Sequence, residues 1–389
     1  MRTTLLRRVL LSATAVLCTV AAPARAQFVS PVPDSAADRA LYERLSALAM
    51  ASYDSLRGGF VRRDGTPCES AIELALVRGR EGDTLAAARA RRTLGWMRAL
   101  LDTVGGGWVN GLKDRDPGHS SFQKLTATNA RRLELLALAP GALPGAERAV
   151  VDYFDRVLVD PRGGFLTGQG GSQDLEPESN GLALQAWWRL GVRDADSTRR
   201  AFAWKSSDRA WAVCRDEDFG LVRKDLWGKI REPSLLADQV EMGRALLFAW
   251  RAAGRDTDLV RARELGLAIC AHFEDDHGGF RNDFAGERFG KGRRSPRPFE
   301  DNARAARFLA ELGRTTGERP LANAGRRAWV VFQRQFDKPR LELADWALAV
   351  RASFADDGPE RSRWGVPEPR PEAPKPAKTP AKKKAAKRR

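Results

Sequence analysis

The stretch Arg162-Gly163-Gly164-Phe165 decides the fold of this chain, because it recurs along the sequence. Close copies are Arg57-Gly58-Gly59-Phe60 and His277-Gly278-Gly279-Phe280, and looser copies are Gly106-Gly107-Trp108 and Asp218-Phe219-Gly220. Each copy follows a segment with helical apolar periodicity and precedes an irregular stretch, after which a second periodic segment begins. The sequence therefore predicts a repeating unit of about fifty residues, made of a helix, a long loop, a second helix and a short turn.

The second helices of these units share a common start position, which an amide occupies in most repeats. The six aligned residues are Ser70, Asn129, Asn180, Gln239, Asn302 and Trp346. The first helices are predicted at 37–53, 83–102, 144–158, 197–213, 258–273 and 320–334. The second helices are predicted at 67–78, 123–138, 176–190, 234–251, 298–313 and 340–353.

Six antiparallel hairpins of this kind close into a ring. Because each second helix reaches the next first helix through a short turn, the long loops gather on one face. We therefore predict an all-α, (α/α)6 toroid without a strand domain, with any site on the long-loop face. The second helices should form the inner ring, since they are rich in small residues such as Ala183 and Ala305. In addition, Thr66-Pro67-Cys68-Glu69 has the pattern of a capping box at the first inner helix.

The aligned helix starts should line a central funnel with amides and carboxylates. Sugars need both hydrogen-bond donors and acceptors, and two carboxylates on opposite walls can act as acid and base. Helix N-termini also favour acidic residues through capping and the macrodipole, so a structural interpretation of the carboxylates stays open. The candidate catalytic residues are Glu178, Asp238, Glu300 and Asp301.

The substrate-binding candidates combine the amides with tryptophans. A Trp face stacks on the apolar side of a sugar ring, although a Trp on an inner helix is more often part of the core. Two of these tryptophans fall in or beside long loops and the third on an inner helix. The candidates are Asn129, Asn180, Gln239, Asn302, Trp108, Trp227 and Trp346.

No motif indicates a nucleotide, serine-hydrolase or metal site. The chain has no Gly-x-Gly-x-x-Gly after a strand, no Gly-Lys-Ser/Thr phosphate loop and no Gly-x-Ser-x-Gly turn. His272 and His277 are spaced so that their rings do not share one helical face. We therefore expect no metal and no cofactor. Cys68, Cys214 and Cys270 form no Cys-x-x-Cys pair and are interpreted as structural thiols.

The two ends of the chain differ from its centre. Residues 1–26 combine a basic start, an apolar run and Ala24-Arg25-Ala26, which predicts a signal peptide cleaved near Ala26 and a secreted or periplasmic location. Residues 358–389 are rich in Pro, Ala, Lys and Arg and have too little apolar content to fold. We expect this tail either to contact an anionic envelope surface or to act as a solubilising segment.

Most of the net charge of +16 lies in these two ends. Residues 27–357, the predicted toroid domain, are therefore nearly balanced in charge. This excludes a uniformly basic nucleic-acid-binding domain, and we expect no nucleic acid as a partner.

Leu235-Leu236-Ala237-Asp238-Gln239, Gly278-Gly279-Phe280 and Pro298-Phe299-Glu300-Asp301-Asn302-Ala303 resemble the helical part of the spermatogenesis-associated, thioredoxin-domain-containing proteins. The resemblance covers residues 40–353. In that family the helical part is similar to six-hairpin glycosidases, which implies a carbohydrate-related activity. The thioredoxin-like domain of the family has no counterpart in this sequence, so the resemblance implies no redox function.

Two hypotheses follow from the sequence. The first is an exported six-hairpin glycosidase-like protein that processes a glycan through paired carboxylates. The alternative is a non-catalytic glycan-binding or envelope scaffold protein. Both predict a carbohydrate or another polyhydroxylated ligand, and the sequence leaves open whether the protein is an enzyme.

Overall fold

The computed structural model describes residues 35–111, 124–170, 174–224, 228–232, 234–284 and 295–355. Within these ranges outer and inner helices alternate along the chain. The outer helices are α1 (Ser35–Ala51), α3 (Thr84–Trp96), α5 (Ala146–Tyr153), α7 (Ser197–Cys214), α9 (Asp256–Ala268) and α11 (Arg319–Phe332). The inner helices are α2 (Glu69–Arg80), α4 (Thr126–Leu138), α6 (Pro177–Arg193), α8 (Leu236–Ala253), α10 (Phe299–Thr316) and α12 (Leu343–Phe354). Every predicted helix is present.

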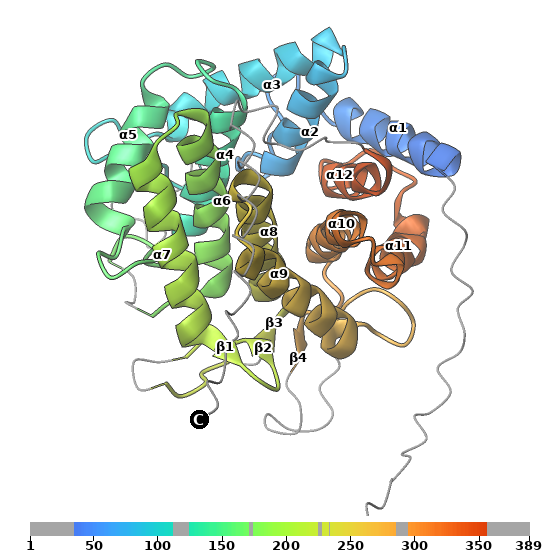
Figure 1. Cartoon of the computed structure of the whole chain (residues 1–389). Coiled ribbons are helices and arrows are strands. Elements are labelled where there is room, and N and C mark those ends of the chain that lie inside the picture. Colours follow the sequence, from blue (N-terminus) through green and yellow to red (C-terminus); the bar gives the residue numbers. More distant parts are fainter. Residues whose placement is uncertain are drawn as a thin grey trace, which may run out of the picture. The chain divides into compact units, whose positions relative to one another are not determined.

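The helices close into a ring. Each inner helix contacts the next inner helix along the chain, and α12 contacts both α2 and α1. Figure 1 shows α12 beside α1 and α2, although these helices lie at opposite ends of the colour scale. Since the last inner helix packs on the first, the predicted (α/α)6 toroid is confirmed.

The inner helices approach each other closely where small residues lie between them. A Cβ atom on Gly181 of α6 would stand 2.4 Å from the carbonyl carbon of Glu241 in α8. Any side chain at this position would therefore force the two helices apart. Ala183 and Ala305 are fully buried in the same ring. The inner position of the second helices, predicted from their small residues, is confirmed.

Each of four long loops is tied to its inner helix by the amide at the aligned position. Asn180 Oδ1 accepts a hydrogen bond from Phe165 N at 2.9 Å, and Asn180 Nδ2 donates to Phe165 O at 3.0 Å. The backbone reaches this amide because Gly164 takes a φ of +95°, which glycine adopts without strain. The same paired hydrogen bonds join Asn129 to Trp108, Gln239 to Leu221 and Asn302 to Phe280. We call these four residues the anchor amides.

The loops and helix ends contain local structure that the sequence did not predict. Several outer helices end in a short stretch of different winding, such as the π-helical segments η3 (Phe154–Leu158) and η4 (Ile269–Phe273). Two pairs of two-residue antiparallel strands lie in the described loops. They are β1 (Arg215–Asp216) with β2 (Gly220–Leu221), and β3 (Ser234–Leu235) with β4 (Asp283–Phe284).

The predicted capping box at the start of α2 is wrong. Cys68 holds the N-cap position and makes no side-chain cap. Thr66 Oγ1 instead donates to Asp64 Oδ1 at 2.7 Å. Glu69, which the capping box would have used, accepts a hydrogen bond from Arg132 Nε of α4 at 3.0 Å. The Glu69 carboxylate is therefore bound by a neighbouring inner helix and not by its own backbone.

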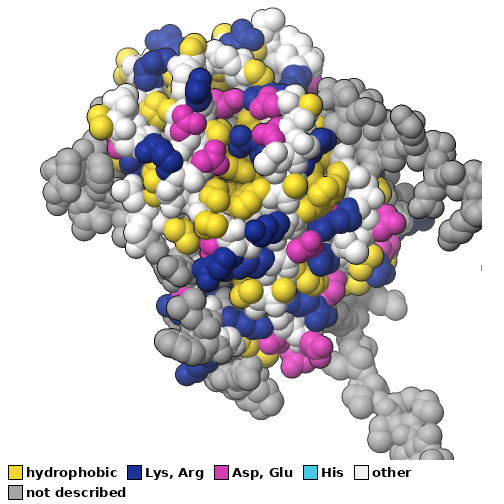
Figure 2. Space-filling view, turned by 60° about the vertical axis from the view of Figure 1, so that its left-hand side comes forward, with side chains coloured by type: hydrophobic (Ala, Val, Ile, Leu, Met, Phe, Trp, Pro, Cys, Tyr) yellow, Lys and Arg dark blue, Asp and Glu magenta, His cyan; other side chains and the backbone are white. Residues whose placement is uncertain are grey.

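The surface of the described part is mixed in character. On the face shown in Figure 2, basic and acidic side chains are interspersed with apolar ones. None of the described helices combines the length and the apolar character needed to cross a membrane. Cys68, Cys214 and Cys270 are free thiols, and the first two are buried. This agrees with their interpretation as structural thiols.

Candidate functional site

A cavity of about 180 Å³ opens at the N-terminal ends of the inner helices, on the long-loop face. Its walls come from α2, α4, α6 and α10, with one side chain from the first long loop. The lining residues are Arg62, Glu69, Ser70, Ala127, Thr128, Arg131, Glu178, Leu182 and Arg304. This volume equals about six water molecules at liquid density, which is comparable to one sugar ring. We call it the central cavity.

Glu178, in the first turn of α6, carries the most perturbed carboxyl of the cavity wall. Its pKa is raised from 4.5 to about 7, mainly by burial and also by the charges of Asp238, Glu241 and Asp301, while Arg223 opposes them. Glu178 Oε2 lies 3.4 Å from Arg223 Nη2. A carboxyl group with this pKa holds a proton for a large part of the time at neutral pH.

Asp238 contacts the backbone of Glu178 and is not part of the cavity wall. Its side chain is fully buried. Asp238 Oδ1 accepts a hydrogen bond from Glu178 N at 3.0 Å, and both carboxylate oxygens accept from Arg223 at 3.1 Å. The catalytic assignment of Asp238 is therefore corrected, because its oxygens are engaged and closed off from a ligand. Asp238 is a positioning residue for Arg223 and for the first turn of α6.

Glu300 and Asp301, at the start of α10, both face Arg304. Arg304 Nη1 lies 3.3 Å from Asp301 Oδ1, and Arg304 Nη2 lies 3.5 Å from Glu300 Oε2. Burial raises the pKa of both carboxyl groups, and the neighbouring Asp345 carboxylate adds to this in each case. Both remain partly exposed, but they contribute no wall of the central cavity. They act on it through Arg304, which does.

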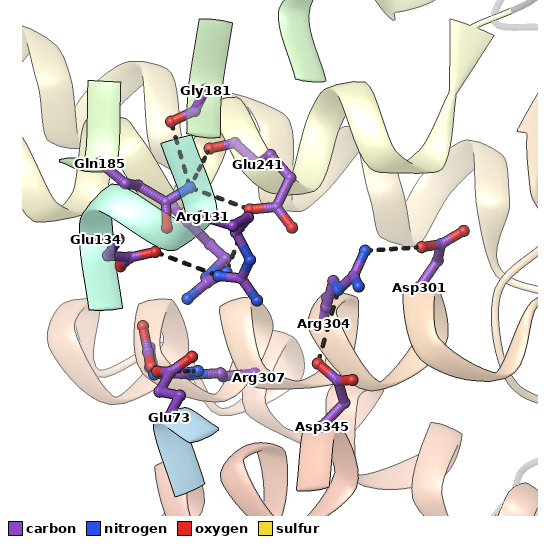
Figure 3. Close-up of polar contacts among 12 residues, drawn as sticks. Glu73, Arg131, Glu134, Gly181, Gln185, Glu241, Asp301, Arg304, Arg307 and Asp345 are labelled. Carbon is purple, nitrogen blue, oxygen red and sulfur yellow. Dashed lines mark hydrogen bonds and ion pairs between the residues drawn. The ribbon is translucent and has the colours of Figure 1, made fainter. Parts of the chain in front are cut away.

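Arginines are the main cavity residues that the sequence did not reveal. Arg131 donates one hydrogen bond, from Nη1 to Glu134 Oε2 at 3.3 Å. Figure 3 shows Arg304 joined to Asp301 and to Asp345, with Arg131 and Glu241 in the same region. The Glu241 carboxylate interacts with both guanidinium groups. The cavity therefore offers guanidinium donors beside a carboxyl acid.

Below the central cavity, alternating charges fill the axis of the toroid. Arg307 Nη1 lies 2.8 Å from Glu73 Oε1, and Arg189 Nε lies 2.8 Å from Glu134 Oε1. All six inner helices contribute to this group, which we call the charge belt. Its members are Glu73, Arg131, Glu134, Gln185, Arg189, Glu241, Arg244, Arg251, Arg304, Arg307, Glu311 and Asp345.

The charge belt forms the floor of the cavity and fixes its side chains. Figure 3 shows part of this arrangement, including the pairs of Arg307 with Glu73 and Arg304 with Asp345. Burying a charge without a partner costs several kcal/mol, so each member depends on its neighbours. Two carboxylate oxygens at this level, Glu241 Oε1 and Asp345 Oδ2, are buried without a hydrogen-bond partner among the described residues.

The anchor amides do not line the funnel. All four are buried, with no more than 2% of the residue surface exposed, and their polar atoms are bonded to loop backbone. Their predicted role in substrate binding is corrected, because a buried loop backbone needs these hydrogen bonds. The residues concerned are Asn129, Asn180, Gln239 and Asn302.

Two of the three tryptophan candidates, Trp108 and Trp346, also lie away from the cavity wall. Trp108 is fully buried, and its backbone is held by an anchor amide. Trp346 is fully buried and packs its ring against Phe332, with the centroids 5.1 Å apart. Both belong to the core, which corrects their assignment as stacking platforms. Trp227 lies outside the described residues.

The sequence does contain a signal for the cavity residues. Arg131 and Arg304 follow their anchor amides by two positions, and Glu178 precedes its own by two. Successive residues of an α-helix are about 100° apart, so a residue two positions away lies on nearly the opposite side. In α4, α6 and α10 the cavity residues therefore lie on the face opposite the aligned amide, whereas in α2 the aligned Ser70 itself lines the cavity.

The described residues include no group of three or more His, Cys, Asp or Glu side chains arranged to hold a metal ion. His272 stacks on Phe284, with the ring centroids 4.6 Å apart. Its environment is therefore aromatic.

No family model matches the chain, and no curated protein matches its sequence. Solved structures do match its fold. A D-mannose isomerase matches with a TM-score of 0.67 and 12% identity, covering 82% of this chain and 98% of that one. Cellobiose 2-epimerase from Bacillus thermoamylovorans matches with a TM-score of 0.67 and 11% identity, covering 81% and 99%.

The GH76 α-mannanase from Bacteroides thetaiotaomicron matches with a TM-score of 0.59 and 10% identity, covering 82% of this chain and 98% of that one. Identities this low show the fold alone. The chain therefore shares its (α/α)6 fold with these structures over nearly their whole length.

Proposed function

We propose that this protein processes a carbohydrate in the central cavity by acid–base chemistry, with Glu178 as the general acid. The observation that carries the proposal is the carboxyl of Glu178, which stands in the cavity wall with a pKa raised to about 7. A carboxylic acid with this pKa is matched to proton transfer near neutral pH. The fold supports the same class of ligand, since the isomerase, epimerase and mannanase it matches are named for their action on sugars.

Glu69 is the complementary carboxylate in this proposal. It is the other acidic residue of the cavity wall, and Arg132 and Arg62 lie 3.0 Å and 3.8 Å from its oxygens. The two guanidinium groups hold the Glu69 carboxylate in place at the cavity wall. Glu178 on α6 and Glu69 on α2 both line the central cavity, and α4 lies between these two helices in the ring.

In glycoside hydrolysis this pair would work as follows. Glu178 donates its proton to the glycosidic oxygen, and the bond from that oxygen to the anomeric carbon breaks. Glu69 takes a proton from the water molecule whose oxygen bonds to the anomeric carbon. The two products leave, and the two carboxyl groups exchange protons with solvent. Attack from the face opposite the leaving group inverts the anomeric configuration.

The experiment that tests the proposal is a screen of glycans with product analysis on the purified protein, followed by Glu178→Gln. We expect the variant to lose about 100-fold or more in kcat/KM, because it retains shape but has no proton to donate. Glu217→Gln is the matched control, since it makes the same chemical change at an exposed residue outside the cavity. Equal activity of Glu178→Gln and the control would contradict the assignment of the acid.

Binding without turnover would favour the second hypothesis, a non-catalytic glycan-binding or envelope scaffold. The observation that favours it is that Glu300 and Asp301 are both engaged by Arg304. Glu69 is engaged in the same way, by Arg132 at 3.0 Å and by Arg62 at 3.8 Å. In a scaffold, substitution of Glu178 would change affinity without any product being formed.

The family and the location of the protein are further proposals. The resemblance of residues 40–353 to the spermatogenesis-associated, thioredoxin-domain-containing proteins supports a relationship to that family, and the shared six-hairpin fold is consistent with it.

The composition of residues 1–26 supports export to a secreted or periplasmic location after cleavage near Ala26, with residues 27–357 as the toroid domain. The basic residues 358–389 support contact with an anionic envelope surface. N-terminal sequencing of the exported protein should give a start at Gln27, and an uncleaved Met1 would contradict this.

A further inference from the structure

A second cavity adjoins the central one on the side of the first long loop. It has a volume of about 630 Å³ and is lined by residues 61–64, residues 339–342 and Ser52. Arg62 lines both cavities and therefore forms their common wall. Its guanidinium lies 3.3 Å from Glu300 and 3.8 Å from Glu342, which hold it in this position. We call the second cavity the side groove.

The sizes of the two cavities differ in a way that bears on the ligand. At about 30 Å³ per water molecule, the central cavity equals about six waters and the side groove about twenty. If the central cavity holds one sugar ring, the side groove has room for further residues of the same chain. Val61, Pro339 and Leu341 give it an apolar side, against which the C–H faces of sugar rings can pack.

The charges of the side groove are not balanced. Among the residues that the structure describes, neither Arg63 nor Arg340 has a carboxylate within ion-pair distance. Arg62, in the common wall, instead meets three carboxylates. Asp64, an acid of the groove, accepts hydrogen bonds from the backbone and hydroxyl of Thr66. Arg63 and Arg340 therefore stand in the groove without an ion-pair partner among the described residues, and the groove lining has three arginines against two acids.

Arg340 is held in place for binding. Its guanidinium lies 3.8 Å from the ring centroid of Phe299, and its Nη2 donates to Gln335 O at 3.2 Å. Its Nε is buried and has no hydrogen-bond partner among the described residues. A guanidinium that is already stacked on a ring loses little further conformational entropy when it binds a ligand. Its planar fork of N–H donors fits a carboxylate or sulfate. Arg63 is exposed and free to approach the same anion.

We infer that the side groove is a subsite for an acidic residue of a longer glycan, whose carboxylate or sulfate group is bound by Arg63 and Arg340. This inference rests on the proposed function, because it takes the central cavity to hold the neighbouring sugar ring. It names the substrate class as acidic oligosaccharides rather than neutral ones. Arg62, with its three carboxylate partners, separates the two subsites.

The test measures binding of short acidic oligosaccharides and of their uncharged counterparts to the full chain. The probes are tri- to hexasaccharides from polygalacturonate, alginate, hyaluronan and heparan sulfate, each used before and after reduction of its carboxyl groups. We expect at least one acidic series to bind, with an affinity that falls as salt is added. Carboxyl reduction should abolish this binding if the group is a uronate, whereas reduced heparan sulfate should still bind if the group is a sulfate.

Two variants connect the binding to the groove. Arg63→Gln and Arg340→Gln should each weaken binding of the acidic probe about tenfold, which corresponds to about 1.4 kcal/mol. Arg91→Gln, on outer helix α3 and outside both cavities, removes the same charge and should leave affinity unchanged. Arg340 also packs on Phe299, so Arg340→Gln is first checked for folding by circular dichroism. If it is unfolded, the test rests on Arg63→Gln alone.

The outcomes separate this inference from the proposed function. Binding of neutral and acidic probes with equal affinity, unchanged in Arg63→Gln, would overturn the acidic subsite and leave the carbohydrate proposal standing. Failure of every probe, acidic and reduced alike, would overturn both. Binding of the acidic probes that Arg91→Gln weakens as much as Arg63→Gln would show attraction to the overall charge and would also overturn the subsite.

Discussion

Replacing Asn180 by alanine tests whether the anchor amides hold the loops or bind a ligand. The substitution removes three hydrogen bonds, two to Phe165 and one from Nδ2 to Glu176 O at 3.0 Å. Phe165 and Asn180 are both fully buried, so the N–H and C=O of Phe165 would have no water to replace the amide. Each unpaired buried group costs about 1–3 kcal/mol. We expect the free energy of unfolding to fall by about 3–5 kcal/mol.

Urea unfolding followed by tryptophan fluorescence measures this loss, and glycan binding is measured on the same samples. A loss of this size should also lower the melting temperature by about 6 °C or more. Asn323→Ala is the matched control, because Asn323 lies on outer helix α11 and makes no side-chain hydrogen bond within the described chain. It should change stability by no more than about 0.5 kcal/mol. If Asn180→Ala unfolds like the control while glycan binding is lost, the amide is a ligand group and does not hold the loop.

The remaining predictions concern other buried groups. Folding raises the pKa of Glu178 from 4.5 to about 7, so between these pH values the native state keeps a proton that the unfolded state releases. The wild type should therefore lose stability relative to Glu178→Gln as the pH rises through this range. Melting temperatures of the two proteins that change in parallel with pH would contradict this. Glu73→Gln removes the carboxylate that lies 2.8 Å from Arg307 in the charge belt, and should lower the free energy of unfolding in urea by about 2–3 kcal/mol. Adding Arg307→Met should restore part of this loss. If the stability losses of the two single variants simply add in the double variant, the pairing is contradicted. Burial raises the pKa of Cys68 and of Cys214 to about 12, so both should resist iodoacetamide until urea unfolds the chain, as mass spectrometry would show; rapid labelling of the native protein would contradict their burial.

The ring of helices could be predicted because its signals are local. A Gly-Gly-Phe turn needs glycine wherever φ is positive, and an inner helix needs small residues wherever it meets its neighbour. Both requirements act on single positions, and the glycine turn recurs five times and the inner helix six times along the chain. The repeat therefore fixed the number of hairpins, the long-loop face and the inner ring, and each of these is found in the structure.

The start of α2 could not be predicted from its sequence pattern. Thr66 and Glu69 have the spacing of a capping box, but each finds a different partner: Thr66 bonds to Asp64 in its own loop, and Glu69 bonds to Arg132 of α4. A capping box is worth about 1 kcal/mol, so a charge-assisted hydrogen bond to a neighbouring helix competes with it successfully.

Local patterns in the sequence are enough to show that six helical hairpins repeat, where their long loops gather, and which positions recur at the inner helix starts. Which side of each inner helix faces the axis depends instead on contacts between segments that are distant in the chain. The anchor amides face the loops because the buried backbone of the Gly-Gly-Phe turns needs hydrogen-bond partners. Residues two positions away lie about 200° around the helix, so Arg131, Glu178 and Arg304 face the cavity. The sequence pattern gives the spacing of the repeats along the chain. The rotation of each inner helix about its own axis depends on hydrogen bonds between segments that meet only in the folded ring.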